Sequence, residues 1–232
     1  MKKKLIISAA ILVLLILILF GTLKWMNSRT FQLFGGITNQ VTTDQKVIAL
    51  TFDDGPTANV DQILPLLDNY KAKATFFLIG GELEKNPDEG RKIAAAGHEI
   101  GNHTFSHDRM VFKSPSYIRD EIEKTNALIR QTGYKGEILF RPPYGKKLIG
   151  LPYYLNKHHM KTITWNLEPD TFYSTTADKV RYVQDKVKPG DILLLHPMYD
   201  SNEITAINEI LQALKEQGYS FVTVSELLKL QQ

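Results

Sequence analysis

The chain has 232 residues, a length that suits one sizeable α/β domain, and its apolar and charged fractions are those of a globular protein. It contains no cysteine, which excludes disulfides and thiolate metal sites and leaves histidine and carboxylates as metal ligands. Residues 1–24 carry four lysines and no acid. The remaining 24 basic and 25 acidic residues leave the rest near neutral, so the charge does not indicate a nucleic-acid partner.

The N-terminus predicts a membrane helix. Three lysines precede an apolar run of nineteen residues, from Leu5 to Leu23. As a helix this run extends about 28 Å, close to the roughly 30 Å hydrocarbon core. A cleaved signal peptide is the alternative, but the run ends without a small residue three positions before a plausible cleavage site. We expect a basic cytoplasmic tip at 1–4, an uncleaved signal anchor at 5–24 and a connector at 25–44, which makes the rest external in a single-pass cell-membrane protein.

Short apolar runs alternate with helical patterns over residues 45–232. Asn86 and Pro87 have the arrangement of a capping box with proline at the first helical position, and Ser114 begins another helix. Apolar residues at helical spacing predict a third helix over 203–217. The predicted strands are 47–52, 74–79, 98–101, 138–141, 162–165, 192–196 and 220–224. The alternation indicates an α/β fold with a parallel sheet or a small (β/α) barrel.

Two adjacent acids, Asp53 and Asp54, follow the first predicted strand and precede a Gly-Pro turn. Carboxylates at the end of a buried strand are costly unless a metal ion or a reacting group holds them in the charged form. His103 and His107 follow the third strand, and a spacing of four lets both rings reach one ion. Two histidines and one carboxylate suit catalytic Zn²⁺ or Fe²⁺, although a pair of surface histidines explains that motif taken alone.

Three further predicted strands end in polar side chains. Arg141 opens the sequence Arg-Pro-Pro-Tyr-Gly, where a guanidinium can hold a carboxylate ionised and the rigid turn leaves the Tyr144 N–H available to a ligand. His196 ends the sixth strand. Acids and aromatic residues over 165–172 can tune a histidine and line a sugar-binding groove. Because reactive groups gather at the carboxyl ends of strands in such folds, their recurrence favours one site.

Together these motifs resemble the polysaccharide deacetylases with a NodB-type domain, carbohydrate esterase family 4, over about residues 47–228. The resemblance implies an α/β fold over 45–232, a distorted (β/α)7-type barrel, which the predicted single N-terminal transmembrane helix precedes. It implies a hydrolase that removes N-acetyl groups from N-acetylglucosamine units of a cell-wall or surface polysaccharide, most naturally peptidoglycan, and releases acetate. The expected partners are the glycan and the membrane, and the domain is expected to be monomeric.

The resemblance also implies roles for individual residues. Asp54, His103 and His107 would bind a divalent metal, usually Zn²⁺, with Co²⁺, Ni²⁺ and Fe²⁺ as alternatives. Asp53 would act as the general base, and Arg141 would orient it.

His196 would protonate the departing amine. The Tyr144 backbone N–H, beside Pro143, would help to stabilise the oxyanion and contact the substrate.

The fifth strand departs from the family pattern, in which an aspartate is followed directly by a tryptophan. Thr171 and Phe172 stand at these two positions, so Phe172 would form the aromatic wall of the groove. A carboxylate that supports His196 would have to come from Glu168 or Asp170, and we expect Asp170 to substitute.

Other functions remain open from sequence. A catalytically weakened wall-glycan-binding domain would keep the fold and the metal, and a chitooligosaccharide or acetyl-ester deacetylase would differ only in its groove. A non-haem iron oxygenase also uses two histidines and a carboxylate, but the sequence shows no co-substrate motif. A glycosidase is disfavoured, because consecutive strand residues such as Asp53 and Asp54 point to opposite faces.

Overall fold

The computed structural model describes residues 2–231, and its centre is a parallel sheet built on one strand, β2 (Val47–Asp53). β3 (Thr75–Leu78) and β6 (Ile192–Leu195) both pair with β2, and β4 (Glu99–Asn102) pairs with β3. β7 (Ser220–Val222) pairs with the first residues of β2. Every residue of β2 after the first is buried, as expected for a parallel strand covered on both faces.

Two short strands lie apart from this sheet. β1 (Ile37–Thr38) pairs with β5 (Thr162–Ile163), and Phe140 forms isolated bridges to β5 and to the end of β4. Another bridge joins Leu167 to β6, so the strands outline a ring that stays open within residues 2–231. The arrangement is a distorted barrel-type fold without closure.

The predicted strand over 138–141 is wrong, since only Phe140 bridges to its neighbours. Pro142 and Pro143 follow directly, and proline has no N–H to continue a ladder. The predicted strand over 162–165 ends at Ile163.

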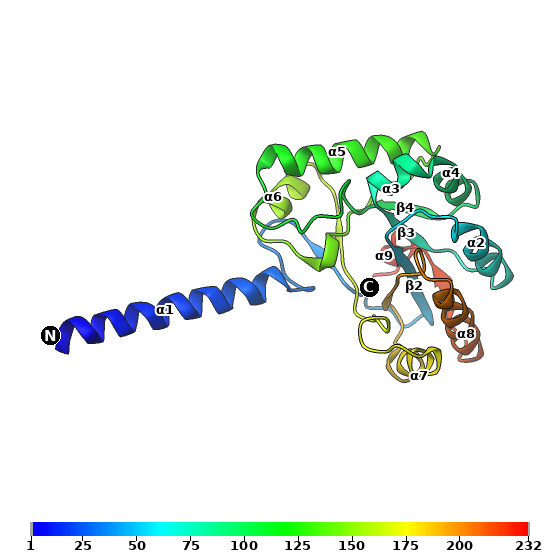
Figure 1. Ribbon diagram of the computed structural model, residues 1–232. Coiled ribbons are helices and arrows are strands. Elements are labelled where there is room, and N and C mark those ends of the chain that lie inside the picture. The colour runs from blue at the N-terminus through cyan, green and yellow to red at the C-terminus, as the bar shows by residue number, and fades with distance from the viewer. Residues whose placement is uncertain (1, 232) are drawn as a thin grey trace.

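The helices lie around the strands, and α1 (Lys2–Met26) extends away from the domain, as Figure 1 shows. Its length and apolar composition are sufficient to cross a membrane, and none of its residues is buried. The others are α2 (Val60–Asn69), α3 (Gly80–Lys85), α4 (Pro87–Ala95), α5 (Pro115–Gln131), the 3₁₀ helix η1 (Pro143–Gly145), α6 (Gly150–Lys157), α7 (Thr176–Lys186), α8 (Asn202–Glu216) and α9 (Val224–Leu228).

The three predicted helices are confirmed as α4, α5 and α8, but one predicted cap is wrong. Ser114 caps α5 by accepting a hydrogen bond from the Tyr117 N–H at 3.2 Å. Asn86 makes no side-chain cap to α4, because its amide donates instead to the carbonyls of Pro56 and Glu82.

Because side chains alternate along β2, Asp53 points to the same side of the strand as the second hydrophobic core described below. Ile48, Leu50 and Phe52 pack with the helices in the main core. Ala49 packs in a second core with Phe77, Leu139, Ile163, Trp165 and Leu194. Thr51 and Asp53 share the side of Ala49, because side chains alternate along a strand. The second core therefore has polar groups at the carboxyl end of β2.

A glycine pair tests how tightly the ring is packed. Gly190 and Gly133 both have positive φ, of 86° and 90°. They differ in the space around them. A Cβ on Gly190 would lie 1.8 Å from the Val41 carbonyl oxygen, whereas a Cβ on Gly133 would meet nothing within 4 Å. We expect Gly133→Ala to cost about 1–2 kcal/mol of unfolding free energy from backbone strain. Gly190→Ala should cost about 1–3 kcal/mol more from overpacking. Urea unfolding measures both, and equal losses would contradict the packing.

Candidate active site

A buried ion pair lies at the carboxyl end of β2. Arg141 Nη1 donates to Asp53 Oδ1 at 2.6 Å and to Thr51 Oγ1 at 2.9 Å, and Nη2 donates to the Thr164 carbonyl at 3.2 Å. The two charged side chains are 0% and 3% exposed. Burial by itself raises the pKa of Asp53, but the positive charges of Arg141, His103 and His196 outweigh it and lower the pKa below its ordinary value. Asp53 is therefore held as a carboxylate.

Asp54, His103 and His107 form a second cluster, whose potential ligand atoms all lie within 4.8 Å of one another. Asp54 Oδ1 is 3.3 Å from His107 Nε2 and 3.9 Å from His103 Nε2. His103 Nδ1 is 2.7 Å from the Arg141 carbonyl oxygen, which leaves its Nε2 to face Asp54. Asp54 Oδ1 is buried without a hydrogen-bond partner among the residues that the structure describes. A carboxylate oxygen and two imidazole nitrogens converge here, and such donors fit a divalent cation.

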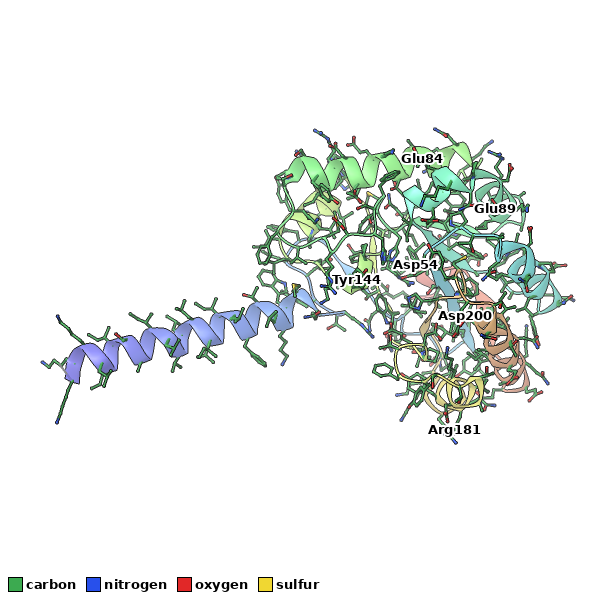
Figure 2. All side chains as sticks on the ribbon, in the orientation of Figure 1. Asp54, Glu84, Glu89, Tyr144, Arg181 and Asp200 are labelled. Atoms are coloured by element: carbon green, nitrogen blue, oxygen red, sulfur yellow. The ribbon has the colours of Figure 1, made fainter. Side chains whose placement is uncertain are left out.

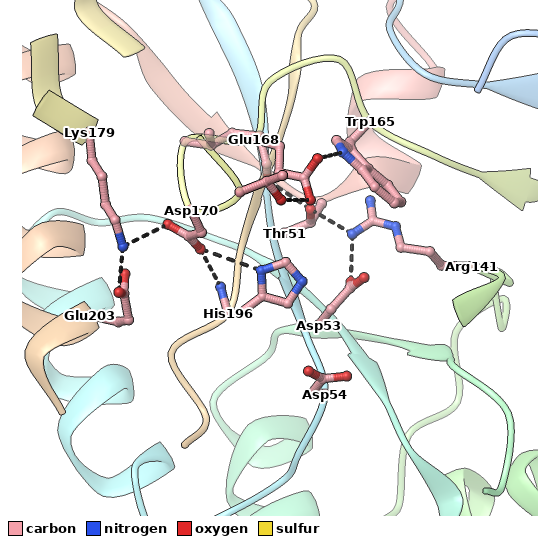
Figure 3. Close-up of polar contacts among 12 residues, drawn as sticks. Thr51, Asp53, Asp54, Arg141, Trp165, Glu168, Asp170, Lys179, His196 and Glu203 are labelled. Atoms are coloured by element: carbon pink, nitrogen blue, oxygen red, sulfur yellow. Dashed lines mark hydrogen bonds and ion pairs between the residues drawn. The ribbon is translucent and has the colours of Figure 1, made fainter. Parts of the chain in front are cut away.

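His196 lies across the cavity, next to Asp170 (Figure 3). Asp170 Oδ2 accepts from the His196 backbone N–H at 2.8 Å and is 3.4 Å from its Nδ1. The buried Lys179 Nζ is 3.3 Å from Asp170 Oδ1 and also pairs with Glu203. Burial lowers the pKa of His196, but the hydrogen bond to Asp170 and the charges of nearby aspartates, Asp53 first, outweigh it and raise the pKa to about 9.

Glu168 has other partners. Its carboxylate binds Arg29 Nη2 at 2.7 Å, Trp165 Nε1 at 2.8 Å and Thr171 Oγ1 at 2.7 Å. Of the two carboxylates considered from sequence, the structure places Asp170 beside His196 and holds Glu168 in the wall.

Asp53, Asp54 and the three histidines described above line one cavity of about 410 Å³. Its lining is Arg29, Asp53, Asp54, His103, His107, Tyr144, Trp165, Glu168, Thr171 and His196. A second cavity of about 490 Å³, bordered by Phe105 and Tyr199, shares Asp54 and His107 with the first. The candidate metal ligands thus lie between two hollows, a shape that suits an extended ligand.

Of the three aromatic or proline residues predicted to contact substrate, only Tyr144 lines the first cavity. The Tyr144 ring is half exposed and lies 4.8 Å from the His107 ring, and Figure 2 shows Tyr144 near Asp54. Pro143 is buried and Phe172 lies beside Tyr182, and neither lines these two cavities. Trp165, from the same aromatic and acidic segment, lines the first cavity.

Sequence reasoning missed several residues of the site. Thr51 could have been found, since it precedes Asp53 by two on the same face of a strand. No sequence signal points to Arg29, Lys179 or Glu203, because each reaches the site through a tertiary contact.

Comparisons with known proteins identify the family. The polysaccharide deacetylase family model matches residues 40–163. The chain belongs to the polysaccharide deacetylase family. The prediction of a polysaccharide deacetylase, a hydrolase of carbon–nitrogen bonds, is therefore confirmed.

One relative is a peptidoglycan-N-acetylglucosamine deacetylase of Bacillus cereus, 37% identical over 84% of this chain and 94% of its own length. Another is a bifunctional xylanase/deacetylase of Pseudobutyrivibrio xylanivorans, 38% identical over 82% of this chain, which spans only 31% of that protein. Among solved structures, a mutant of a Bacillus anthracis family 4 pseudoenzyme with restored activity aligns with a TM-score of 0.77 and 32% identity, covering 84% of this chain and 72% of that one. These likenesses support the barrel-type fold.

The raised pKa of His196 gives a direct test. In the metal-free protein the ring should titrate near pH 9. In Asp170→Asn the pKa should fall well below that value, because the ionic hydrogen bond to Asp170 and its charge are lost while burial remains. NMR titration of histidine-labelled protein measures both. Glu168→Gln is the control, and an equal shift in that variant would contradict the pairing.

Proposed function

We propose that the protein is an anchored external enzyme that removes N-acetyl groups from N-acetylglucosamine units of peptidoglycan and releases acetate. The observation that carries this proposal is the buried Arg141–Asp53 pair beside the cluster of Asp54 and two histidines. A domain that only binds glycan needs no carboxylate held ionised there. The name of the Bacillus cereus relative, which this chain matches over nearly its whole length, supports the substrate class.

Asp54, His103 and His107 would hold the cation, with Zn²⁺ the first candidate and Co²⁺, Ni²⁺ or Fe²⁺ as alternatives. When bound, the cation would supply Lewis-acid activation of water and of the acetamide carbonyl. Burial lowers the pKa of His107, which keeps its ring neutral as a ligand must be.

Asp53 would be the general base. Arg141 engages Asp53 Oδ1 and fixes the carboxylate, while Oδ2 faces His103 Nε2 at 3.5 Å. Asp53 would take a proton from water as the water oxygen bonds to the acetamide carbon.

His196 would be the general acid on the opposite side. A pKa of about 9 keeps it protonated at neutral pH, so it can give its proton to the nitrogen as the carbon–nitrogen bond breaks. The amine stays on the sugar, which becomes glucosamine, and the acyl group is released as acetate. The Tyr144 N–H, in the turn with Pro143, would donate to the oxyanion.

A glycan-binding domain without activity is the second candidate, because a family 4 pseudoenzyme has a similar structure. Acetylated xylan and chitooligosaccharides are alternative substrates. Acetate release from each purified glycan, with added Zn²⁺ or Co²⁺, separates these possibilities.

The two adjacent acids should respond differently to the same change. Asp53→Asn should keep bound metal but lose about 10²–10⁴-fold in deacetylation rate, because the base is removed. Asp54→Asn should lose the bound metal, because a carboxylate ligand is removed. Elemental analysis and acetate release measure the two effects, with thermal unfolding as a control for folding. An Asp53→Asn variant as active as the parent would refute the mechanism.

Membrane attachment is a further part of the proposal, since α1 is apolar throughout its centre. We expect the full chain in the membrane fraction with residues 1–24 intact by mass. Replacing Leu14 and Leu15 by arginine should release it, because each charge at a helix centre costs about 2.5–3.5 kcal/mol on insertion. A chain that lacks residues 1–24 would show instead that the helix is a cleaved signal peptide.

A further inference from the structure

The segment after α1 is fixed to the domain. The Lys147 N–H donates to the Met26 carbonyl at 3.2 Å, and Lys147 Nζ donates to the Ser28 carbonyl. Thr164 Oγ1 donates to the Arg29 carbonyl at 2.6 Å. These bonds begin at the last residue of the helix. The domain is thus held close to the end of α1.

Exposed apolar side chains gather around this end. Phe112 is 85% exposed, and four other large apolar residues are about half exposed. We call the five the apolar collar: Phe31, Leu33, Phe112, Ile149 and Tyr153. Phe112 also has a φ of 55°, which is unfavourable for a bulky aromatic residue. Phe112 belongs to none of the three hydrophobic clusters of the described residues.

The collar comes from three segments that touch one another. The rings of Phe34 and Tyr153 lie 5.4 Å apart, which joins the connector to α6. A bridge between Met110 and Lys147 brings in the loop before α5. The Phe31 ring is 6.2 Å from that of Trp25, in the last turn of α1. The collar therefore surrounds the place where α1 leaves the domain.

The same segments are basic. Residues 24–43, 109–118 and 138–167 contain no aspartate or glutamate. The nearby Asp108 is paired with Lys113 at 2.6 Å. Lys24 and Arg29 belong to the first of these segments, Arg109 and Lys113 to the second, and Lys146 and Lys157 to the third. Of these six, Arg29 is paired with Glu168 at 2.7 Å. Apolar side chains with a basic border suit the interface of an anionic lipid layer.

We propose that the apolar collar rests on the lipid surface from which α1 emerges. The collar is continuous with the apolar helix, and aromatic residues such as Trp25 and Tyr153 favour the level of the lipid headgroups. A lipid surface is therefore a better occupant than a second protein. The inference rests on the proposed anchoring of the chain.

The collar also locates the active site. Arg29 belongs to the connector and lines the catalytic cavity. It lies six residues beyond Leu23, and a chain spans at most about 3.6 Å per residue, so Arg29 is within about 22 Å of the end of the apolar run. In Figure 2 Tyr144, on the same cavity, lies on the side of the domain that α1 enters. The substrate is then glycan held at the membrane surface.

The absence of cysteine from the chain allows a direct test of the lipid contact. Full-length Phe112→Cys carries an environment-sensitive fluorophore in vesicles of equal parts phosphatidylglycerol and phosphatidylcholine. Its emission should shift to the blue and lose most of its intensity with lipid-borne quenchers. The matched control is Asp88→Cys on α4, which is exposed and lies away from α1 in Figure 1, and it should show neither change. Equal, weak quenching at both positions would overturn the proposal.

A second experiment tests the consequence for substrate. Phe112→Asp and Ile149→Asp, in the same vesicles, are assayed on an N-acetylglucosamine oligomer that is either soluble or lipid-anchored. Turnover of the anchored oligomer should fall while turnover of the soluble one stays unchanged, because the collar lies outside the catalytic cavity. Equal turnover of the anchored oligomer by parent and variants would overturn the placement. A parent inactive on both oligomers would refute the deacetylase instead, and the fluorescence result would still decide the collar.

Discussion

The buried ion pair between Arg141 and Asp53 is the constraint on which the rest of the site depends. A buried charge left without its partner costs about 3–5 kcal/mol, so each member holds the other in place. The same guanidinium also binds Thr51 on β2 and the Thr164 carbonyl, while the Arg141 carbonyl orients His103. Arg141 therefore connects the central strand β2, the segment of Thr164 and the candidate metal ligand His103.

The loops around this pair are held in unusual conformations. Asp54, Thr104, His107 and Tyr144 all have positive φ, between 58° and 69°. Each costs of order 1–3 kcal/mol and persists only where the surroundings fix it. Hydrogen bonds fix two of these turns, since the Thr104 N–H donates to Asn102 Oδ1 at 2.8 Å and the His107 N–H donates to Thr104 Oγ1 at 3.1 Å. Four of the seven non-glycine residues with positive φ among residues 2–231 thus lie at or next to the candidate site, where a fixed geometry is useful.

Charge divides the site into two halves with opposite tasks. Arg141 keeps the pKa of Asp53 low, and Asp170 with other nearby carboxylates keeps the pKa of His196 high. A deprotonated base and a protonated acid can therefore coexist at neutral pH across one cavity. Lys179 and Glu203 extend the second half into α7 and α8, so the helices on that side help to fix Asp170.

The sequence by itself determined the chemistry that local patterns carry. Acids after an apolar run, two histidines at a spacing of four and an arginine before two prolines were enough to predict the fold class and the family. The sequence did not determine closure of the ring, the partner of His196 or the entry of Arg29 into the cavity. Those features depend on contacts between residues far apart in the chain, such as Asp170 with His196 and Arg29 with Glu168. Only the tertiary structure decided them, because a carboxylate binds the nearest cation in space and distance along the chain does not reveal it.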